Sequence, residues 1–152
     1  YNVDLGLWCE WEAAAGSAKF NGISATSLNG TVYVQDVANG RIYTLATGTY
    51  QDSGTTFSVT LQTPRSNFGS QNRKFEESVD LVADTTTGTI NVQVSDDDFS
   101  NFSTARTIDM TSQVKRLSRL GSFYDRSHKF VYTQNAAFRA QAFIPKITQG
   151  AT

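Results

Sequence analysis

Cysteine, histidine, methionine and proline are scarce in this chain of 152 residues, and two of these shortages exclude whole classes of site. Cys9 is the only cysteine, so no intrachain disulfide can form. His128 is the only histidine, and one His with one Cys cannot supply the ligands of a zinc site. No apolar run reaches the ~18 residues that a membrane-spanning helix needs. We therefore predict no disulfide, no metal site and no membrane span.

Signatures of catalysis are also lacking. A Ser-His-Asp triad would have to use His128, which lies in an alternating segment and is expected to pack rather than react. The sequence has no Gly-x-Ser-x-Gly elbow and no glycine-rich phosphate loop. A glycosidase needs two well-placed carboxylates, and the acidic residues of segment 76–84 share one predicted strand, where surface charge explains them. We predict no catalytic residue, no cofactor and no enzyme activity.

The chain is instead rich in polar and aromatic residues. Hydrophobic residues make up 39% of it, and ten Phe, six Tyr and two Trp supply bulky core material. Apolar residues recur with a period of two along most of the chain, which is the pattern of half-buried strands. The only helical signal is one short stretch around residues 13–15. The sequence therefore predicts an all-β protein.

Residues 1–50 have the pattern of a propeller blade built from antiparallel strands. Asn29-Gly30 and Asn39-Gly40 are typical of hairpin turns, because both residue types accept a positive φ. Two such turns in succession fit a four-stranded blade. One blade cannot bury both of its faces alone, so we expect a truncated segment cut from a longer protein. The strands predicted here are 23–28, 31–36 and 41–46.

Residues 54–148 are predicted to form an antiparallel β-sandwich or jelly-roll-like unit that follows a polar linker. The clearest alternation places Phe57, Val59 and Leu61 on one face of a strand. Further along, Val79 and Leu81 share one side of a long strand. The strands predicted in this unit are 55–63, 74–83, 90–94, 104–110, 127–133 and a last one from 138 that ends near Pro145.

Residues 95–102 stand at the spacing of the Asp-box hairpin, Ser-x-Asp-x-Gly-x-Thr-Trp. In that hairpin the Asp carboxylate accepts backbone N–H bonds, the Gly supplies an unusual dihedral angle and the aromatic ring packs beneath. Here Phe99 stands in place of Gly, and Asn101 in place of Thr. We interpret the motif as a structural turn carried by Ser95, Asp97 and Phe102.

The three consecutive aspartates of this turn, residues 96–98, offer the oxygen ligands that Ca²⁺ prefers. Successive side chains at the end of a strand point in different directions. We therefore favour the structural interpretation over a metal site.

Charge is divided unevenly along the chain. Residues 1–104 hold 5 Lys/Arg and 12 Asp/Glu, a balance of −7, whereas residues 105–152 hold 8 and 2, a balance of +6. Facing strands of one domain that pair their charges would explain the division. The alternatives are head-to-tail packing of subunits and contact with a nucleic acid.

A cluster of basic residues dominates the second half of the chain. Such a cluster can contact phosphates, here with Phe123 and Tyr124 as neighbouring aromatics. It can also form salt bridges to acidic strand residues such as Glu76, Glu77 and Asp80. We consider these residues a candidate interface or DNA-facing cluster: Arg106, Lys115, Arg116, Arg119, Arg126 and Lys129.

Four aromatic residues of the first half, Trp8, Trp11, Tyr33 and Tyr43, could form a platform on which a sugar stacks. Core packing is the commoner role of aromatics on short strands. Asp boxes recur in sialidase propellers, so the alternative function is a carbohydrate-binding or sialidase-like β module.

One family resemblance spans nearly the whole chain. Its motifs are a hydrophobic strand at 92–94, Ser-Asp-Asp-Asp at 95–98, Phe102-Ser103 with Arg106, and Arg-Leu-Gly-Ser-Phe at 119–123. In this order they resemble the C-terminal part of tail hub or nozzle proteins of short-tailed double-stranded DNA phages, including the "packaged DNA stabilisation" proteins. The upstream segments NGTVYVQD and NGRIYTL resemble a late propeller blade of the same proteins.

The resemblance implies a structural virion protein in a phage tail, assembled in the host cytoplasm. Such a protein forms a homo-oligomeric ring around the DNA exit channel. It would attach to a portal or adaptor, bind tail fibres or a tail needle, and contact packaged DNA without sequence preference. The chain departs from the family pattern at Val94, Phe99, Asn101 and Asp125.

Overall fold

The structure is a computed structural model that describes residues 6, 8 and 20–150. The prediction of an all-β protein is confirmed: the described residues form twelve strands and no helix. The chain divides into two compact units, Tyr1–Phe57 and Ser58–Thr152. The sequence pattern placed this division slightly earlier, between residues 50 and 54.

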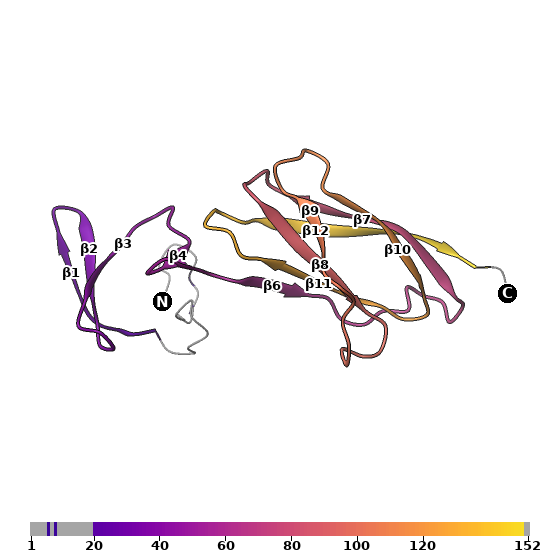
Figure 1. The fold of residues 1–152 in the computed structure, drawn as a ribbon, viewed down its shortest axis with the longest axis horizontal. Helices are drawn as coiled ribbons and strands as arrows, with labels where there is room; N and C mark the ends of the chain where they lie inside the picture. Colours follow the sequence, from indigo (N-terminus) through magenta and orange to yellow (C-terminus); the bar gives the residue numbers. More distant parts are fainter. Residues whose placement is uncertain (1–5, 7, 9–19, 151–152) are drawn as a thin grey trace. The chain divides into compact units, whose positions relative to one another are not determined.

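The first unit contains a three-stranded antiparallel sheet in the order β1-β2-β3 and a separate hairpin, β4-β5 (Figure 1). The turn between β1 and β2 has φ values of 51° at Asn29 and 78° at Gly30, as expected for an Asn-Gly hairpin. Among the large apolar side chains described in this unit, only Val34 is buried. The strands are β1 (Gly22–Leu28), β2 (Thr31–Asp36), β3 (Ile42–Leu45), β4 (Gln51–Asp52) and β5 (Thr55–Thr56).

The second unit is built from two antiparallel sheets, in the orders β10-β7-β12 and β6-β11-β8-β9. Figure 1 shows the strands of both sheets in the part of the ribbon that begins with β6. The strands are β6 (Val59–Gln62), β7 (Lys74–Ala83), β8 (Thr89–Ser95), β9 (Arg106–Asp109), β10 (Arg116–Phe123), β11 (Ser127–Tyr132) and β12 (Ala140–Gln149).

A single apolar core joins the two sheets of the second unit. Val79 and Leu81 enter it from β7, and Phe130 and Tyr132 enter it from β11. Burying a side chain of this size contributes about 1.5–3 kcal/mol. The remaining members are Ile90, Val92, Ile108, Met110 and Leu117. Both sheets therefore depend on each other for their stability.

Two strand predictions need correction, and one strand was not predicted. The strand predicted at 55–63 is two short strands, because the chain leaves one unit and enters the other between Phe57 and Ser58. The last strand runs on to Gln149, because β12 lies at the edge of its sheet, where Pro145 is tolerated. The sequence pattern also missed β10, whose alternation is broken by a bulge between Ser118 and Gly121.

Candidate functional site

The most unusual feature of the second unit is Glu76, a carboxylate with no solvent exposure at its side chain. It lies on β7 at the point where both neighbouring strands shift register, β10 between Ser118 and Gly121 and β12 between Lys146 and Ile147. Along β7 the buried positions are even-numbered as far as Ser78 and odd-numbered from Val79 onward. Glu76 therefore points inward, while Phe75 is 46% exposed.

Arg126 is the cationic partner of Glu76. It is 2% exposed, and its Nη1 lies 3.0 Å from Glu76 Oε2. The same Nη1 donates to the carbonyl of Leu120 at 3.0 Å, and the guanidinium lies 4.3 Å from the centre of the Phe123 ring. Arg126 thus holds together residues from both sheets.

Asp96 completes the charge balance of Arg126. Its two carboxylate oxygens accept from Nε and Nη2 of Arg126 at 2.7 and 2.8 Å, a bidentate geometry. Burial by itself would lower the pKa of Arg126, but the bonds with Asp96 and Glu76 outweigh it and raise that pKa. The Asp96 side chain is 42% exposed, so the network reaches from the core to the surface.

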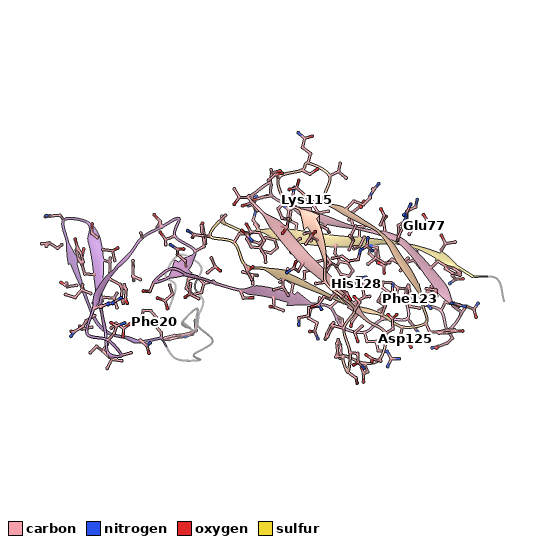
Figure 2. The ribbon with its side chains drawn as sticks, in the orientation of Figure 1. Phe20, Glu77, Lys115, Phe123, Asp125 and His128 are labelled. Carbon is pink, nitrogen blue, oxygen red and sulfur yellow. The ribbon has the colours of Figure 1, made fainter. Side chains whose placement is uncertain are left out.

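His128 occupies the interior end of this network. Its Nε2 lies 2.8 Å from Glu76 Oε1, and its side chain has no solvent exposure. Figure 2 labels His128 among the strands of the second unit. The imidazole packs against Phe130 and Phe143, and its Nδ1 has no hydrogen-bond partner among the described residues. The expectation that His128 packs in the interior fits this position, because the ring is fully enclosed. We call Glu76, Asp96, Arg126 and His128 the buried charge cluster.

Two lysines of the second unit are also buried, and backbone carbonyls satisfy both. The Lys74 ammonium donates to the carbonyls of Ser70 and Asn72 at 2.7 Å each. The Lys115 ammonium donates to the carbonyl of Ser112 at 2.8 Å and lies 3.3 Å from the Thr85 hydroxyl. Lys115 therefore fixes the loop before β10 and is not part of an exposed basic surface.

Arg106 ties β9 to the bulge of β10. Its guanidinium donates to the carbonyls of Ser118 and Arg119 at 2.8 and 3.0 Å. Because Arg126 bonds the next carbonyl, that of Leu120, two arginines satisfy three successive carbonyls of the bulge. The backbone there is left-handed, with φ values of 63° at Arg119 and 83° at Gly121.

The rest of the predicted basic cluster is dispersed. Arg116 pairs with Asp80 on the adjacent strand, Nε to Oδ1 at 2.5 Å. The Lys129 ammonium lies 4.8 Å from the centre of the Phe102 ring. The Arg119 side chain is exposed and has no hydrogen-bond partner within the described part of the chain. The structure brings Arg106 and Arg126 together around the bulge but does not gather all six residues on one surface.

Pairing between strands of the second unit accounts for much of the uneven charge along the sequence. Acidic residues of segment 76–96 meet basic residues of segment 116–146. The pairs are Glu76–Arg126, Asp96–Arg126, Asp80–Arg116, Asp84–Arg139 and Glu77–Lys146. The simplest of the three explanations, pairing of facing strands, is thus observed within one chain.

The Asp-box-like turn follows β8 and has the bonds expected of such a hairpin. Asp97 Oδ1 accepts from the Ser95 hydroxyl at 2.8 Å and from the Asn101 backbone N–H at 2.9 Å, while Oδ2 accepts from the Asn101 side chain at 2.6 Å. The Asn101 side chain, its N–H and the Ser95 hydroxyl together lower the pKa of Asp97. Phe99 has a φ of 68°, the conformation that Gly supplies in the motif.

These contacts also bear on the calcium alternative. Both oxygens of Asp97 are used by the turn, and both oxygens of Asp96 are used by Arg126. Among residues 6, 8 and 20–150 no group of three or more His, Cys, Asp or Glu side chains could hold a metal ion. Within the same residues no helix is long and apolar enough to cross a membrane.

Tyr33 and Tyr43 of the first unit do not lie on one face of its sheet. Tyr33 pairs with Thr44 across β2 and β3, whereas Tyr43 pairs with Val34. Because neighbouring residues of a strand face opposite sides, Tyr33 and Tyr43 lie on opposite faces of the sheet. Trp8 is 85% exposed, and Trp11 lies outside the described residues.

Sequence reasoning missed Glu76 and Asp96 as members of the buried charge cluster. It named Glu76 as one of several possible salt-bridge partners but expected it at the surface, because strict alternation along β7 does not show the change of face at the bulges. It selected Arg126 for its charge alone. One sequence signal was available. Arg126 closely follows the Arg-Leu-Gly segment, and a bulge in that segment leaves backbone carbonyls that need a hydrogen-bond donor.

The chemistry available to the buried charge cluster is structural. It contains a histidine and a glutamate at hydrogen-bond distance, but both side chains are fully enclosed. What the arrangement does is join β7, β10, β11 and the end of β8 through charged hydrogen bonds. No family model matches this chain, and no curated protein matches it.

Proposed function

We propose that this chain is a non-enzymatic, structural component of a virion, part of the tail hub or nozzle of a short-tailed double-stranded DNA phage. The proposal rests on the resemblance of residues 92–106 and 119–123 to such proteins. The chain acts by assembly into a homo-oligomeric ring around the DNA exit channel. Its further partners are the portal or adaptor above it and the fibres or needle below.

The observation that supports assembly best is the apolar surface of the first unit. Ile42 is 70% exposed, Leu28 61% and Ile23 59%, all on a three-stranded sheet. A small sheet that leaves such side chains in water is marginal by itself and is stabilised by a partner that covers them. Neighbouring subunits of a ring supply such a partner.

The ion pairs of the second unit change what kind of contact the subunits are expected to make. Arg116, Arg126, Arg139 and Lys146 already have carboxylate partners in their own chain. Attraction between an acidic and a basic half is therefore not needed to explain the charges. We propose that apolar contact by the first unit drives assembly, and that such association depends only weakly on salt.

Within this proposal, accessible cations make the contact with packaged DNA. Arg119 and Lys129 remain accessible to some degree, whereas Lys115 and Arg126 are buried. Two such cations give weak binding that falls with salt. This surface is a secondary contact in the proposed tail component.

The experiment that tests assembly is light scattering after size exclusion, over a range of concentrations and at low and high salt. The wild-type chain is compared with Ile42→Asp, which places a charge on the exposed sheet. Val114→Asp is the matched control, because Val114 is an apolar residue of the second unit that is 64% exposed.

The proposal predicts association of the wild type and of Val114→Asp at both salt concentrations, and loss of association in Ile42→Asp. A wild-type chain that stays monomeric at every concentration contradicts it. Association that disappears at high salt and survives Ile42→Asp would support the ionic mechanism instead.

A further inference from the structure

The first unit contains three Asn-Gly dipeptides, at 21–22, 29–30 and 39–40. In such a pair the backbone nitrogen of Gly can attack the side-chain carbonyl carbon of Asn, because Gly has no Cβ to hinder the approach. The reaction requires that the two atoms meet in the right orientation, so local structure controls its rate. The three pairs have the same sequence, and the structure places them in three different environments.

Asn29-Gly30 is the most open of the three. Both residues are exposed and form the turn between β1 and β2. Neither the Asn29 side-chain amide nor the Gly30 N–H has a hydrogen-bond partner within residues 20–150. A Cβ placed on Gly30 would have nothing within 4 Å, so no side chain crowds this turn.

Hydrogen bonds restrain the side-chain amide of Asn39 and the backbone nitrogen of Gly40. Asn39 Oδ1 accepts from the Arg41 N–H at 2.9 Å, and its Nδ2 donates to Asp36 Oδ2 at 3.2 Å and to the Tyr43 hydroxyl at 3.1 Å. The attacking nitrogen of Gly40 donates its proton to the Asp36 carbonyl at 3.1 Å. Both the leaving group and the nucleophile are therefore restrained.

Asn21-Gly22 is held by the sheet. Gly22 is the first residue of β1 and pairs with Asp36, and the Asn21 carbonyl accepts from the Val37 N–H at 3.0 Å. The Phe20 ring and Val34 stand so close over Gly22 that even a Cβ would not fit there. An Asn side chain has little room to reach the Gly22 nitrogen in this geometry.

We propose that Asn29 is a site of spontaneous deamidation and isomerisation, and that the fold protects Asn39 and Asn21. The Gly30 nitrogen loses its proton and forms a bond to Asn29 Cγ, while the Cγ–Nδ2 bond breaks and Nδ2 leaves as ammonia. Water then opens the cyclic imide at either carbonyl, which gives aspartate or isoaspartate. No oxidant or reductant takes part.

The product changes the hairpin in two ways. It carries a new negative charge beside Leu28, which is 61% exposed. Its isoaspartate form adds one atom to the main chain of a two-residue turn, which disturbs the register of β1 against β2. Ageing at Asn29 would therefore alter the apolar sheet of the first unit.

The test is incubation of the folded chain in mildly alkaline buffer, followed by peptide mapping with mass spectrometry and labelling by an isoaspartyl methyltransferase. Asn29 is expected to convert about tenfold or more faster than Asn39 and Asn21. In the urea-unfolded chain the three sites are expected to convert at similar rates. Equal rates in the folded chain, or faster conversion of Asn39, would overturn the proposal.

One variant tests whether hydrogen bonds, rather than position in the chain, slow the deamidation of Asn39. Tyr43→Phe removes one acceptor of Asn39 Nδ2 and is expected to speed conversion at Asn39 while Asn29 is unchanged. Tyr33→Phe is the matched control, since Tyr33 lies on the opposite face of the sheet. Acceleration of Asn39 by both variants would point to general loosening of the unit and would contradict protection by the Tyr43 hydroxyl.

Discussion

Arg126 Nη1 lies 3.0 Å from Glu76 Oε2 in the interior of the second unit, and this ion pair joins its two sheets. Glu76 belongs to β7 of one sheet, and Arg126 immediately precedes β11 of the other. A charge in such a place is costly unless it is paired. The stability of the unit should therefore depend far more on this pair than on the ion pairs at its surface.

Replacing Arg126 by Met is expected to lower the free energy of unfolding by about 3–5 kcal/mol, because Glu76 is then left buried without its cation. The matched control is Arg116→Met, which breaks an exposed pair with Asp80 and should cost about 1 kcal/mol or less. Urea unfolding measures both. Equal losses of unfolding free energy in the two variants would show that the buried pair stabilises the unit no more than the exposed pair does.

Gly121→Ala isolates the cost of backbone conformation in the β10 bulge. Gly121 has a φ of 83°, and an added Cβ would meet no atom within 4 Å, so the expected loss of about 1–2 kcal/mol comes from the left-handed backbone alone. Arg119→Gly should instead raise the free energy of unfolding, because Gly adopts the φ of 63° at this position more easily than Arg does. Ser118→Ala serves as the control in the same strand. Denaturation midpoints in urea distinguish the three, and a neutral Gly121→Ala would argue against the bulge geometry.

The turn at Asp97 predicts a pH dependence whose sign follows from its hydrogen bonds. Because the folded state lowers the pKa of Asp97, this residue stabilises the fold above the unfolded pKa of about 3.9. That contribution disappears as the pH falls through the folded pKa. Asn101→Ala removes the side-chain donor, so the Asp97 pKa should rise toward its ordinary value. Carboxyl chemical shifts followed by NMR during an acid titration measure the change, and an unchanged Asp97 pKa would contradict this explanation of the turn.

The two units should differ in their ability to fold alone. A fragment of residues 58–152 retains both sheets and the whole apolar core, so it is expected to unfold cooperatively in urea. A fragment of residues 1–57 buries only Val34 among its described large apolar side chains and is expected to lack a cooperative transition. Circular dichroism during urea titration compares them. Loss of cooperativity in the 58–152 fragment would mean that the first unit is needed for the second.

Local sequence was sufficient for the features that depend on neighbouring residues. Asn29 and Gly30 indicate a hairpin because both accept positive φ, and the structure has that hairpin. Asp97 was correctly placed in a turn, since its partners Ser95 and Asn101 lie within four residues of it. The alternating segment around His128 likewise predicted a strand, and β11 buries His128, Phe130 and Tyr132.

Only the tertiary structure decided what the charged residues do. Strict alternation could not place Glu76 inside, because the pairing of β7 shifts register against both neighbouring strands and the face that β7 buries changes. Arg126 and Glu76 are fifty positions apart in the sequence, and no local pattern predicts that they pair. The sequence by itself determined an all-β chain with its turns and its unequal charge. The tertiary structure pairs these acidic and basic side chains across strands, because a buried ion is stable only where the fold places a partner beside it.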